Sequence, residues 1–258
     1  MAKNKMYLYG KNSVLERLKA DPASIRQIFI QDNFKSPDLM QLIKAMNIPV
    51  KTVSEKDLLR MKRADRLQGI LAETDKYRYT PFEEMLRRGL EDNMSLIFLD
   101  SLNDPHNLGS ILRITACFGG FAIIIPEHSS CEVNETVIHV ASGGENFVPV
   151  SMVTNLRTAL LKAKKAGYWA VGTVVEDGQD INTTSLPFPL CLVLGAEGKG
   201  IRYGIQKHLD LKVTLPMQGA QLSLNVAMAC AVFAHEIVKQ RKGETGANSA
   251  KGGKRSMQ

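Results

Sequence analysis

Apolar residues occur along this chain in two patterns, as short continuous runs and as longer runs with a helical period. The short runs predict buried strands, and the periodic runs predict helices that pack on them. In residues 1–80 the two kinds of run alternate in short units. This alternation predicts a small α/β domain at the start of the chain.

Largely apolar strands are predicted further along, at 95–100, 121–125 and 190–194. Strands of this composition are typical of parallel sheets that helices cover on both faces. Residues 94–240 therefore form a second, larger α/β domain in this prediction, and residues 81–93 form a connecting helix. Residues 241–258 contain few apolar side chains and are predicted to be a disordered basic tail.

The last apolar run, residues 226–234, has no polar face, which predicts a helix buried on every side. The loop before it ends at Ser223 and Asn225, whose short side chains are suited to cap the first N–H groups of the helix. Met217, Leu222 and Leu224 in the same loop predict an apolar slot for a flat heteroaromatic ring. An ordinary capped core helix is the alternative interpretation.

A helix is also predicted after the strand at 95–100, and Asp104 with Pro105 suffices to begin it. Asn107 is then not needed as a cap. Helical geometry places His106, Ser110 and Arg113 on the stripe opposite the apolar face, so this stripe faces either a cleft or water.

The glycine-rich segment GAEGKG at 195–200 follows the strand at 190–194. Its spacing matches neither the phosphate-binding P-loop nor the dinucleotide fingerprint. Gly195 permits close backbone approach by a ligand at the end of a parallel strand. Glu197, a carboxylate between glycines, is predicted to be a functional hydrogen-bond acceptor.

The net charge of +7 is unevenly distributed, because residues 1–80 carry 16 basic and 9 acidic side chains. A basic N-terminal domain is typical of a protein that binds nucleic acid, although solvated surface lysine is the alternative. The candidate phosphate contacts are Lys11, Arg60, Lys62, Arg63 and Arg66.

No apolar run reaches the length of a membrane span, and the first residues lack the apolar region of a signal peptide. The cysteines are scattered without metal-binding spacing, so no metal site is predicted. We interpret the four cysteines as buried side chains of a protein in the reducing cytoplasm.

Three segments together resemble the motifs of the SpoU (TrmH-like) branch of the SPOUT RNA methyltransferases: NDPHNLGSILRIT, LVLGAEGKGI and LPMQGAQLSLNVAMA. The resemblance covers residues 95–240, and the basic domain before them resembles the L30e-like substrate-binding domain of many members. With that domain, the chain is similar to the ribose methyltransferases that act on guanosine of 23S rRNA.

The resemblance implies a SPOUT-type α/β domain with a trefoil knot, a homodimer, and S-adenosylmethionine as cofactor. It implies cofactor contacts at Gly195, Leu215 and Leu224, to which we add Leu194, Met217 and Thr173. Two residues of the third motif differ from those common in the family: Ala227 stands where many members have a serine, and Leu222 stands where a small polar residue is common. Ser223 and Asn225 are in place, so these differences concern the details of the loop.

The resemblance also implies that Arg113 is central to catalysis. Because an arginine is a poor base, we expect it to stabilise developing negative charge and orient a phosphate. We expect Asn107, Glu197, Ser223 and Asn225 to position the ribose and the loops. The alternatives are a tRNA guanosine 2′-O-methyltransferase and a non-catalytic rRNA-binding assembly protein.

Overall fold

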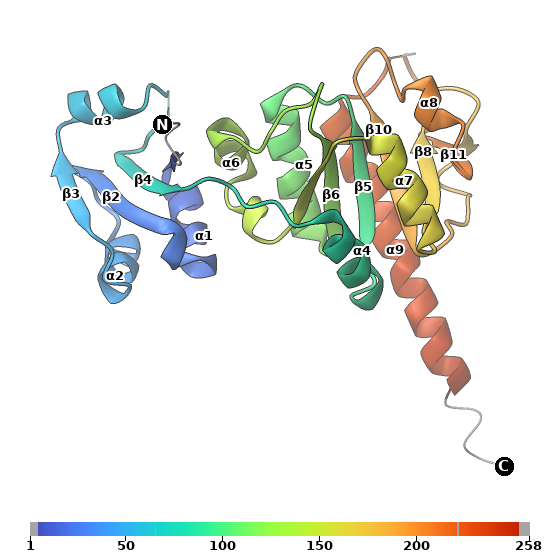
Figure 1. The fold of residues 1–258 in the computed structure, drawn as a ribbon, viewed down its shortest axis with the longest axis horizontal. Helices are drawn as coiled ribbons and strands as arrows, with labels where there is room; N and C mark the ends of the chain where they lie inside the picture. Colours follow the sequence, from blue (N-terminus) through green and yellow to red (C-terminus); the bar gives the residue numbers. More distant parts are fainter. Residues whose placement is uncertain (1–4, 65, 221, 253–258) are drawn as a thin grey trace.

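The protein has two α/β units arranged side by side, as Figure 1 shows for a computed structural model that describes residues 5–64, 66–220 and 222–252. The smaller unit contains a four-stranded sheet in the order β1-β4-β2-β3. Its strands are β1 (Lys5–Tyr9), β2 (Ile25–Gln31), β3 (Val50–Val53) and β4 (Ile70–Asp75). Its helical elements are α1 (Lys11–Ala20), η1 (Pro22–Ser24), α2 (Pro37–Ala45) and α3 (Glu55–Met61).

The larger unit follows α4 (Phe82–Glu91) and contains a seven-stranded sheet in the order β7-β6-β5-β10-β8-β11-β9. All of its strand pairs are parallel, as the apolar runs predict. The strands are β5 (Ser95–Asp100), β6 (Phe121–Pro126), β7 (Val150–Val153), β8 (Trp169–Thr173), β9 (Gln179–Asp180), β10 (Leu190–Gly195) and β11 (Leu211–Thr214).

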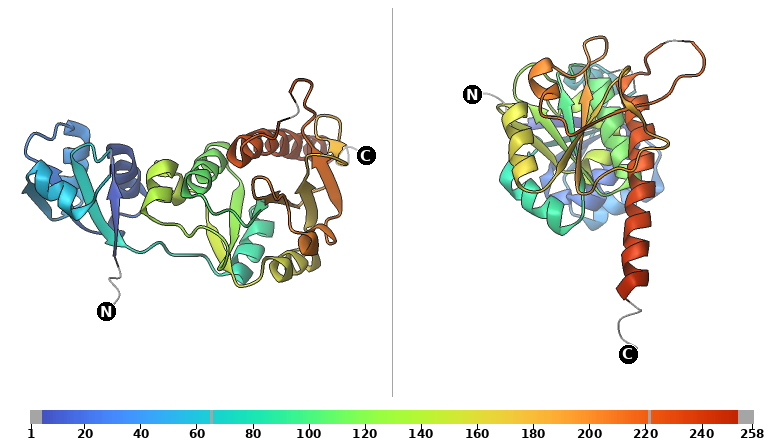
Figure 2. Two further views of the ribbon diagram at one scale, coloured as in Figure 1. Left: turned by 90° about the horizontal axis from the view of Figure 1, so that it is seen from above. Right: turned by 90° about the vertical axis from the view of Figure 1, so that its right-hand side faces the viewer.

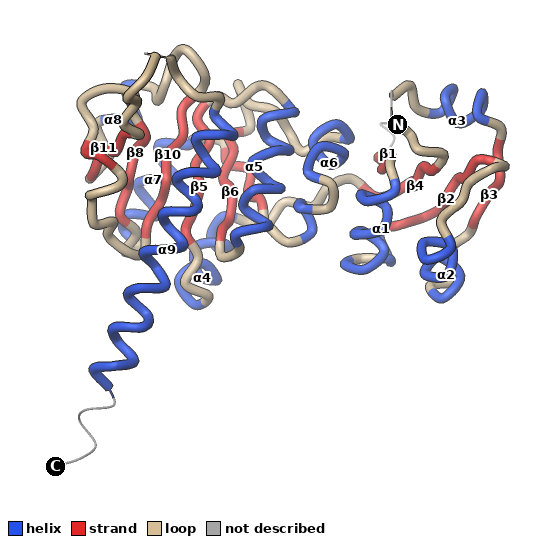
Figure 3. Tube along the Cα trace, turned by 180° about the vertical axis from the view of Figure 1, so that it is seen from behind, coloured by secondary structure: helices blue, strands red, loops and turns tan. Residues whose placement is uncertain are grey.

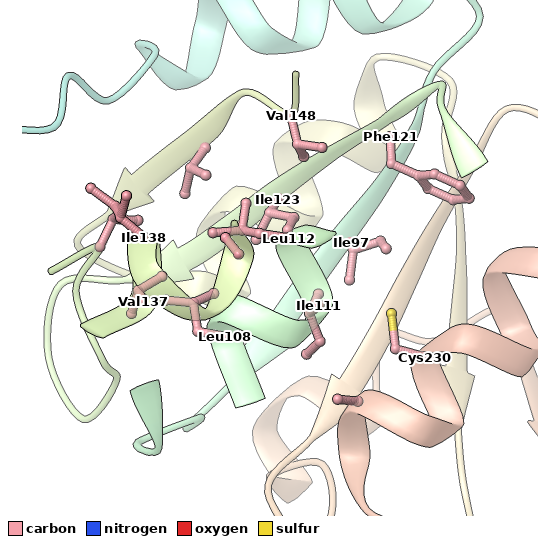
Figure 4. Packing of buried hydrophobic residues seen from close by; sticks show 14 of the residues in the cluster. Ile97, Leu108, Ile111, Leu112, Phe121, Ile123, Val137, Ile138, Val148 and Cys230 are labelled. Carbon is pink, nitrogen blue, oxygen red and sulfur yellow. The ribbon is translucent and has the colours of Figure 1, made fainter. Parts of the chain in front are cut away.

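Helices cover both faces of the large sheet. One face packs against α5 (Pro105–Phe118) and α9 (Val226–Gly252), which lie side by side in Figure 3. The apolar contacts on this face include Ile97, Ile111 and Cys230 (Figure 4). The opposite face packs against α4 and α7 (Leu156–Lys165). The remaining helical elements are α6 (Glu135–Ala141), η2 (Gly144–Asn146) and α8 (Tyr203–Gln206).

The predicted division of α5 into an apolar face and a polar stripe is confirmed. Leu108 and Ile111 are buried, whereas His106 and Arg113 are exposed. Asp104 caps the helix, because its side chain accepts a hydrogen bond from the backbone N–H of His106. The polar stripe therefore lies on the outer surface of the larger unit.

Two features of α9 differ from what the sequence predicts for a single chain. Met228 is 63% exposed and Val232 is 43% exposed, so the helix is not buried on every side within one chain. The helix also continues to Gly252 and projects from the domain (Figure 2), although residues 241–258 are predicted to be disordered. Adding residues to an existing helix avoids the cost of nucleation, which explains how a polar segment extends it. Residues 253–258 lie outside the described residues.

Arg241 attaches α9 to the amino edge of the large sheet. Its guanidinium donates hydrogen bonds to the carbonyl oxygens of Gly119 and Gly120 and lies over the Phe121 ring. The position of α9 is thus fixed at both ends of its packed segment, since Asn225 caps its first turn.

Within the described residues, none of the helices combines the length and the apolar character needed to span a membrane. The same residues hold no group of His, Cys, Asp and Glu side chains suited to a metal ion. Cys131, Cys191 and Cys230 are buried as predicted, whereas Cys117 is exposed on the outer stripe of α5, which the sequence does not predict.

Candidate active site

Three loops meet at the carboxyl edge of the large sheet. The first loop (101–104) follows β5, the second loop (196–202) follows β10, and the third loop (215–220 and 222–225) follows β11. Because β5 and β10 are parallel neighbours and β8 joins β10 to β11, all of these strands end on the same side. The three sequence motifs therefore come together in space, as predicted.

Asn107, Glu197 and Asn225 form one hydrogen-bonded cluster between these loops. The Asn225 side-chain amide donates to Glu197 Oε1 at 2.7 Å and to Asn107 Oδ1 at 2.9 Å. The Asn107 amide donates to the same Glu197 oxygen at 3.2 Å. Each of the three motifs thus contributes one polar side chain to the cluster.

The cluster also fixes the start of α9. Asn225 Oδ1 accepts a hydrogen bond from the Ala227 backbone N–H at 2.9 Å, which confirms the predicted cap. Glu197 Oε1 accepts from the Val226 N–H at 3.4 Å. A carboxylate at a helix N-terminus is favoured by the helix dipole, so Glu197 holds the second loop against α9.

Asp100 is a positioning residue that the sequence analysis did not identify. Its fully buried carboxylate accepts from the Arg202 backbone N–H at 2.8 Å and from Arg202 Nε at 2.6 Å. A buried carboxylate needs such partners, so this pair closes the second loop onto the end of β5. The available signal was an acidic residue at the end of an otherwise apolar strand.

The glycines of the second loop allow the backbone to turn tightly. A Cβ on Gly195 would lie 2.1 Å from the Gly200 carbonyl carbon, so a larger residue cannot occupy that position. Gly198 and Gly200 have positive φ angles of 74° and 63°, a conformation that glycine adopts without strain. The loop is thus a backbone-lined turn at a strand end.

The residues predicted to contact the cofactor end neighbouring strands. Thr173 ends β8, where its hydroxyl donates to the Val193 carbonyl oxygen at 3.3 Å. Leu194 and Gly195 end β10, and Leu215 follows β11. These residues therefore border one region at the carboxyl edge of the sheet.

The apolar slot predicted in the third loop is not closed in the structure. Met217 is 43% exposed, Leu222 is 73% exposed and Leu224 is 40% exposed. Ser223 is exposed beside them. The loop leaves the sheet after Pro216, so its apolar side chains lack a covering element within the described part of the chain.

Arg113 lies apart from the polar cluster. It follows Asn107 by six residues on α5, which places the two side chains about 120° apart around the helix axis and on different turns of the helix. The backbone of Arg113 packs against Gly144 of η2, where a Cβ would lie 2.9 Å from the Arg113 Cα. Arg113 itself is exposed on the outer stripe of α5.

The candidate phosphate contacts of the smaller unit do not form one group. Arg60 and Arg63 line an open groove of about 850 Å³ along α3, together with Lys56 and the exposed Leu59. Lys62, in contrast, is directed toward α6, where it pairs with Glu135. Lys11 donates to the Lys35 carbonyl oxygen at 3.1 Å.

The structure supplies an α/β fold with a polar cluster at the carboxyl edge of its sheet, and comparisons with known proteins identify this class of protein as an RNA methyltransferase. The SpoU rRNA Methylase family matches residues 94–235, and the family described as RNA 2′-O ribose methyltransferase substrate binding matches residues 7–80. The chain belongs to the SpoU rRNA methylase family.

Full-length relatives agree with this assignment. The chain is 34% identical to the 23S rRNA (guanosine-2′-O-)-methyltransferase RlmB of Nitrosomonas europaea, over 93% of this chain and 94% of the relative. It is 32% identical to a TrmH family tRNA/rRNA methyltransferase of Bacillus subtilis, over 93% of this chain and 98% of that relative. The SpoU methyltransferase AviRb of Streptomyces viridochromogenes, solved with AdoMet, superposes with a TM-score of 0.78 at 19% identity, over 93% of this chain and 92% of that one.

Proposed function

We propose that this protein transfers a methyl group from S-adenosylmethionine to the ribose 2′-hydroxyl of a guanosine in 23S rRNA. The observation that carries the proposal is the cluster of Asn107, Glu197 and Asn225, which joins three motif loops at one edge of the sheet. The match to SpoU relatives over both units supports the reaction and the rRNA substrate.

The carboxyl edge of the sheet fits the proposed cofactor. Its backbone groups around Gly195 and Leu215 are suited to hydrogen-bond an adenine ring, and the apolar side chains of Met217 and Leu224 are suited to cover it. We propose Thr173 and Leu194 as further contacts. When bound, S-adenosylmethionine supplies a methyl group activated by a sulfonium charge.

The protein's own residues then supply alignment and charge stabilisation. Asn107, Glu197 and Asn225 hold the three loops in place, and we expect Ser223, which is exposed in the third loop, to contact the ribose. Arg113 orients a substrate phosphate and stabilises the oxygen that develops negative charge. A guanidinium group holds its proton firmly and is a poor base, so the hydroxyl proton leaves to water or to a phosphate.

We propose a homodimer formed through the outer surface of α5 and α9. Met228 and Val232 form an exposed apolar stripe on α9, and Arg113 and Cys117 lie on the adjacent outer stripe of α5. Exposed apolar stripes of this kind mark interaction surfaces. A dimer across this surface places Arg113 at the interface, where it reaches substrate bound at the cluster of the second protomer. The trefoil knot stays a prediction.

We expect the open groove along α3 to bind RNA phosphates. Lys56, Arg60 and Arg63 are exposed around it together with one acidic lining residue, Glu55, and Arg60 pairs with Asp57 at 3.2 Å. Lys56→Glu with Arg63→Glu should weaken binding of unmodified 23S rRNA and reduce the slope of its salt dependence by about two. Filter binding at several salt concentrations measures both quantities.

Lys44→Glu with Lys51→Glu makes the same charge change elsewhere on the smaller unit and serves as the control. An equal loss of affinity in the control pair would show that only the net charge of the domain matters. Binding of S-adenosylmethionine should be unchanged in every variant.

A tRNA substrate and a non-catalytic rRNA-binding role are the alternatives. Calorimetry with S-adenosylmethionine separates the second from an enzyme, because an RNA-binding protein alone should give no binding heat. Incubation with labelled cofactor and unmodified 23S rRNA or tRNA separates the substrates. Ribose label in 23S rRNA is the expected result, and cytoplasmic rRNA is the proposed target in the cell.

A further inference from the structure

The smaller unit touches the larger one through α6, where Glu135 and His139 lie one helical turn apart. Glu135 pairs with Lys62, and its Oε1 accepts a hydrogen bond from the Tyr7 backbone N–H at 2.6 Å. The His139 ring stacks on the Tyr9 ring, with centroids 4.1 Å apart and planes inclined by 14°. An acidic group and a flat ring of one helix therefore cover one patch of the smaller unit.

This patch, made of the Tyr7 N–H, the Tyr9 ring and Lys62, has the chemistry of a nucleotide site. β1 is an edge strand, so the Tyr7 N–H faces away from the sheet and needs an acceptor. Lys62 Nζ lies 5.5 Å from the centre of the Tyr9 ring. A backbone N–H and a lysine bind phosphate oxygens, and an aromatic ring stacks on a base.

We infer that Tyr7, Tyr9 and Lys62 form a nucleotide-binding site for single-stranded RNA, and that α6 covers this site in the free protein. The Glu135 carboxylate occupies the phosphate position, and the His139 ring occupies the base position. RNA binding and the α6 contact are therefore mutually exclusive at this patch. The inference rests on the proposed function, since it assigns a second contact for the same RNA.

Several features of the contact between the smaller unit and α6 favour its reversible separation. The Lys62 and Glu135 side chains remain 23% and 25% exposed, so a phosphate can approach this pair from solvent. The second ion pair of the junction, Arg17 with Glu145, is buried but incompletely satisfied, because Arg17 Nε and Glu145 Oε2 lack a hydrogen-bond partner among the described residues. Burial also raises the pKa of the Glu145 carboxyl, which Arg17 only partly offsets. Separation would return these groups to water.

Apolar packing favours the covered state when RNA is absent. Leu8 and Val14 of the smaller unit belong to the same buried cluster as Val137 and Ala141 of α6. The observed RNA affinity is then the affinity of the uncovered patch multiplied by the fraction of molecules in which the patch is uncovered. Weakening the α6 contact should raise that affinity, whereas damaging the patch should lower it.

The test compares these two kinds of variant in the full-length protein. Glu135→Gln and His139→Ala should each tighten binding of unmodified 23S rRNA roughly threefold, the scale of one partly exposed contact. Tyr9→Ala should weaken binding roughly tenfold, the scale of one lost base–aromatic stack. Filter binding measures the affinities, and thermal melting verifies that the smaller unit of each variant is folded, because Tyr9 is 6% exposed and packs in the core of that unit.

Glu132→Gln is the matched control, because it removes the same charge from an exposed residue in the segment before α6. Tighter RNA binding in Glu135→Gln but not in Glu132→Gln supports the inference. Unchanged or weaker binding in both Glu135→Gln and His139→Ala would overturn it and identify the patch as a domain contact alone. The unaltered protein would still methylate 23S rRNA in that case, so failure of the proposed function is distinguishable.

Discussion

Arg113→Ala should reduce methyl transfer at least ~100-fold, the scale of losing one donor that stabilises charge in a transition state. Arg113 is exposed on the outer stripe of α5 and lies apart from the residues that border the proposed cofactor site. Affinity for S-adenosylmethionine should therefore stay nearly constant. Single-turnover transfer to unmodified 23S rRNA, together with calorimetry, measures the two effects separately.

Arg157→Ala removes an exposed arginine from α7 on the opposite face of the sheet and serves as the control. Its turnover should match that of the unaltered protein. Full turnover in Arg113→Ala would refute the assignment of Arg113 and leave the polar cluster as the catalytic centre.

Glu197→Ala should lower turnover roughly 10- to 100-fold, which corresponds to about 1–3 kcal/mol for polar groups left without their acceptor. Glu197 Oε1 accepts hydrogen bonds from Asn107, Asn225 and the Val226 N–H. Its loss releases the second loop from the start of α9. Because that loop borders the proposed cofactor site, S-adenosylmethionine affinity should fall with turnover.

Glu197→Gln keeps an acceptor oxygen at this position and should retain most of the activity. This pair of variants separates positioning by a hydrogen-bond acceptor from proton transfer by a carboxylate. A glutamine variant as inactive as the alanine variant would contradict the positioning role and assign Glu197 to proton transfer.

The sequence predicts the framework of the site because local signals are strong there. The apolar segment at 95–100 forms β5, and Asp104 begins α5 as predicted. The expected cap at Asn225 is also present. Parallel strands that end on one side then bring the three motifs together, as their chain order and the apolar pattern predict.

Contacts between distant residues were not predictable in the same way. Asp100 stands out as an acidic residue at the end of an apolar strand, but nothing in the sequence identifies Arg202 as its partner. Glu135 and Lys62 each look like ordinary charged residues in the sequence. The helix predicted at 226–234 is not fully buried within one chain, because Met228 and Val232 face outward. A helix without a polar face reveals that apolar surface must be covered, but not whether the same chain covers it.

Mapping the methyl group on unmodified 23S rRNA after incubation with the protein and S-adenosylmethionine tests the central claim most directly. Mass spectrometry of nuclease fragments should locate one new methyl group on the ribose 2′-oxygen of a guanosine, and the Arg113→Ala variant should leave that position unmodified. A methyl group on a base, or 23S rRNA that stays unmodified while tRNA is methylated, would contradict the account.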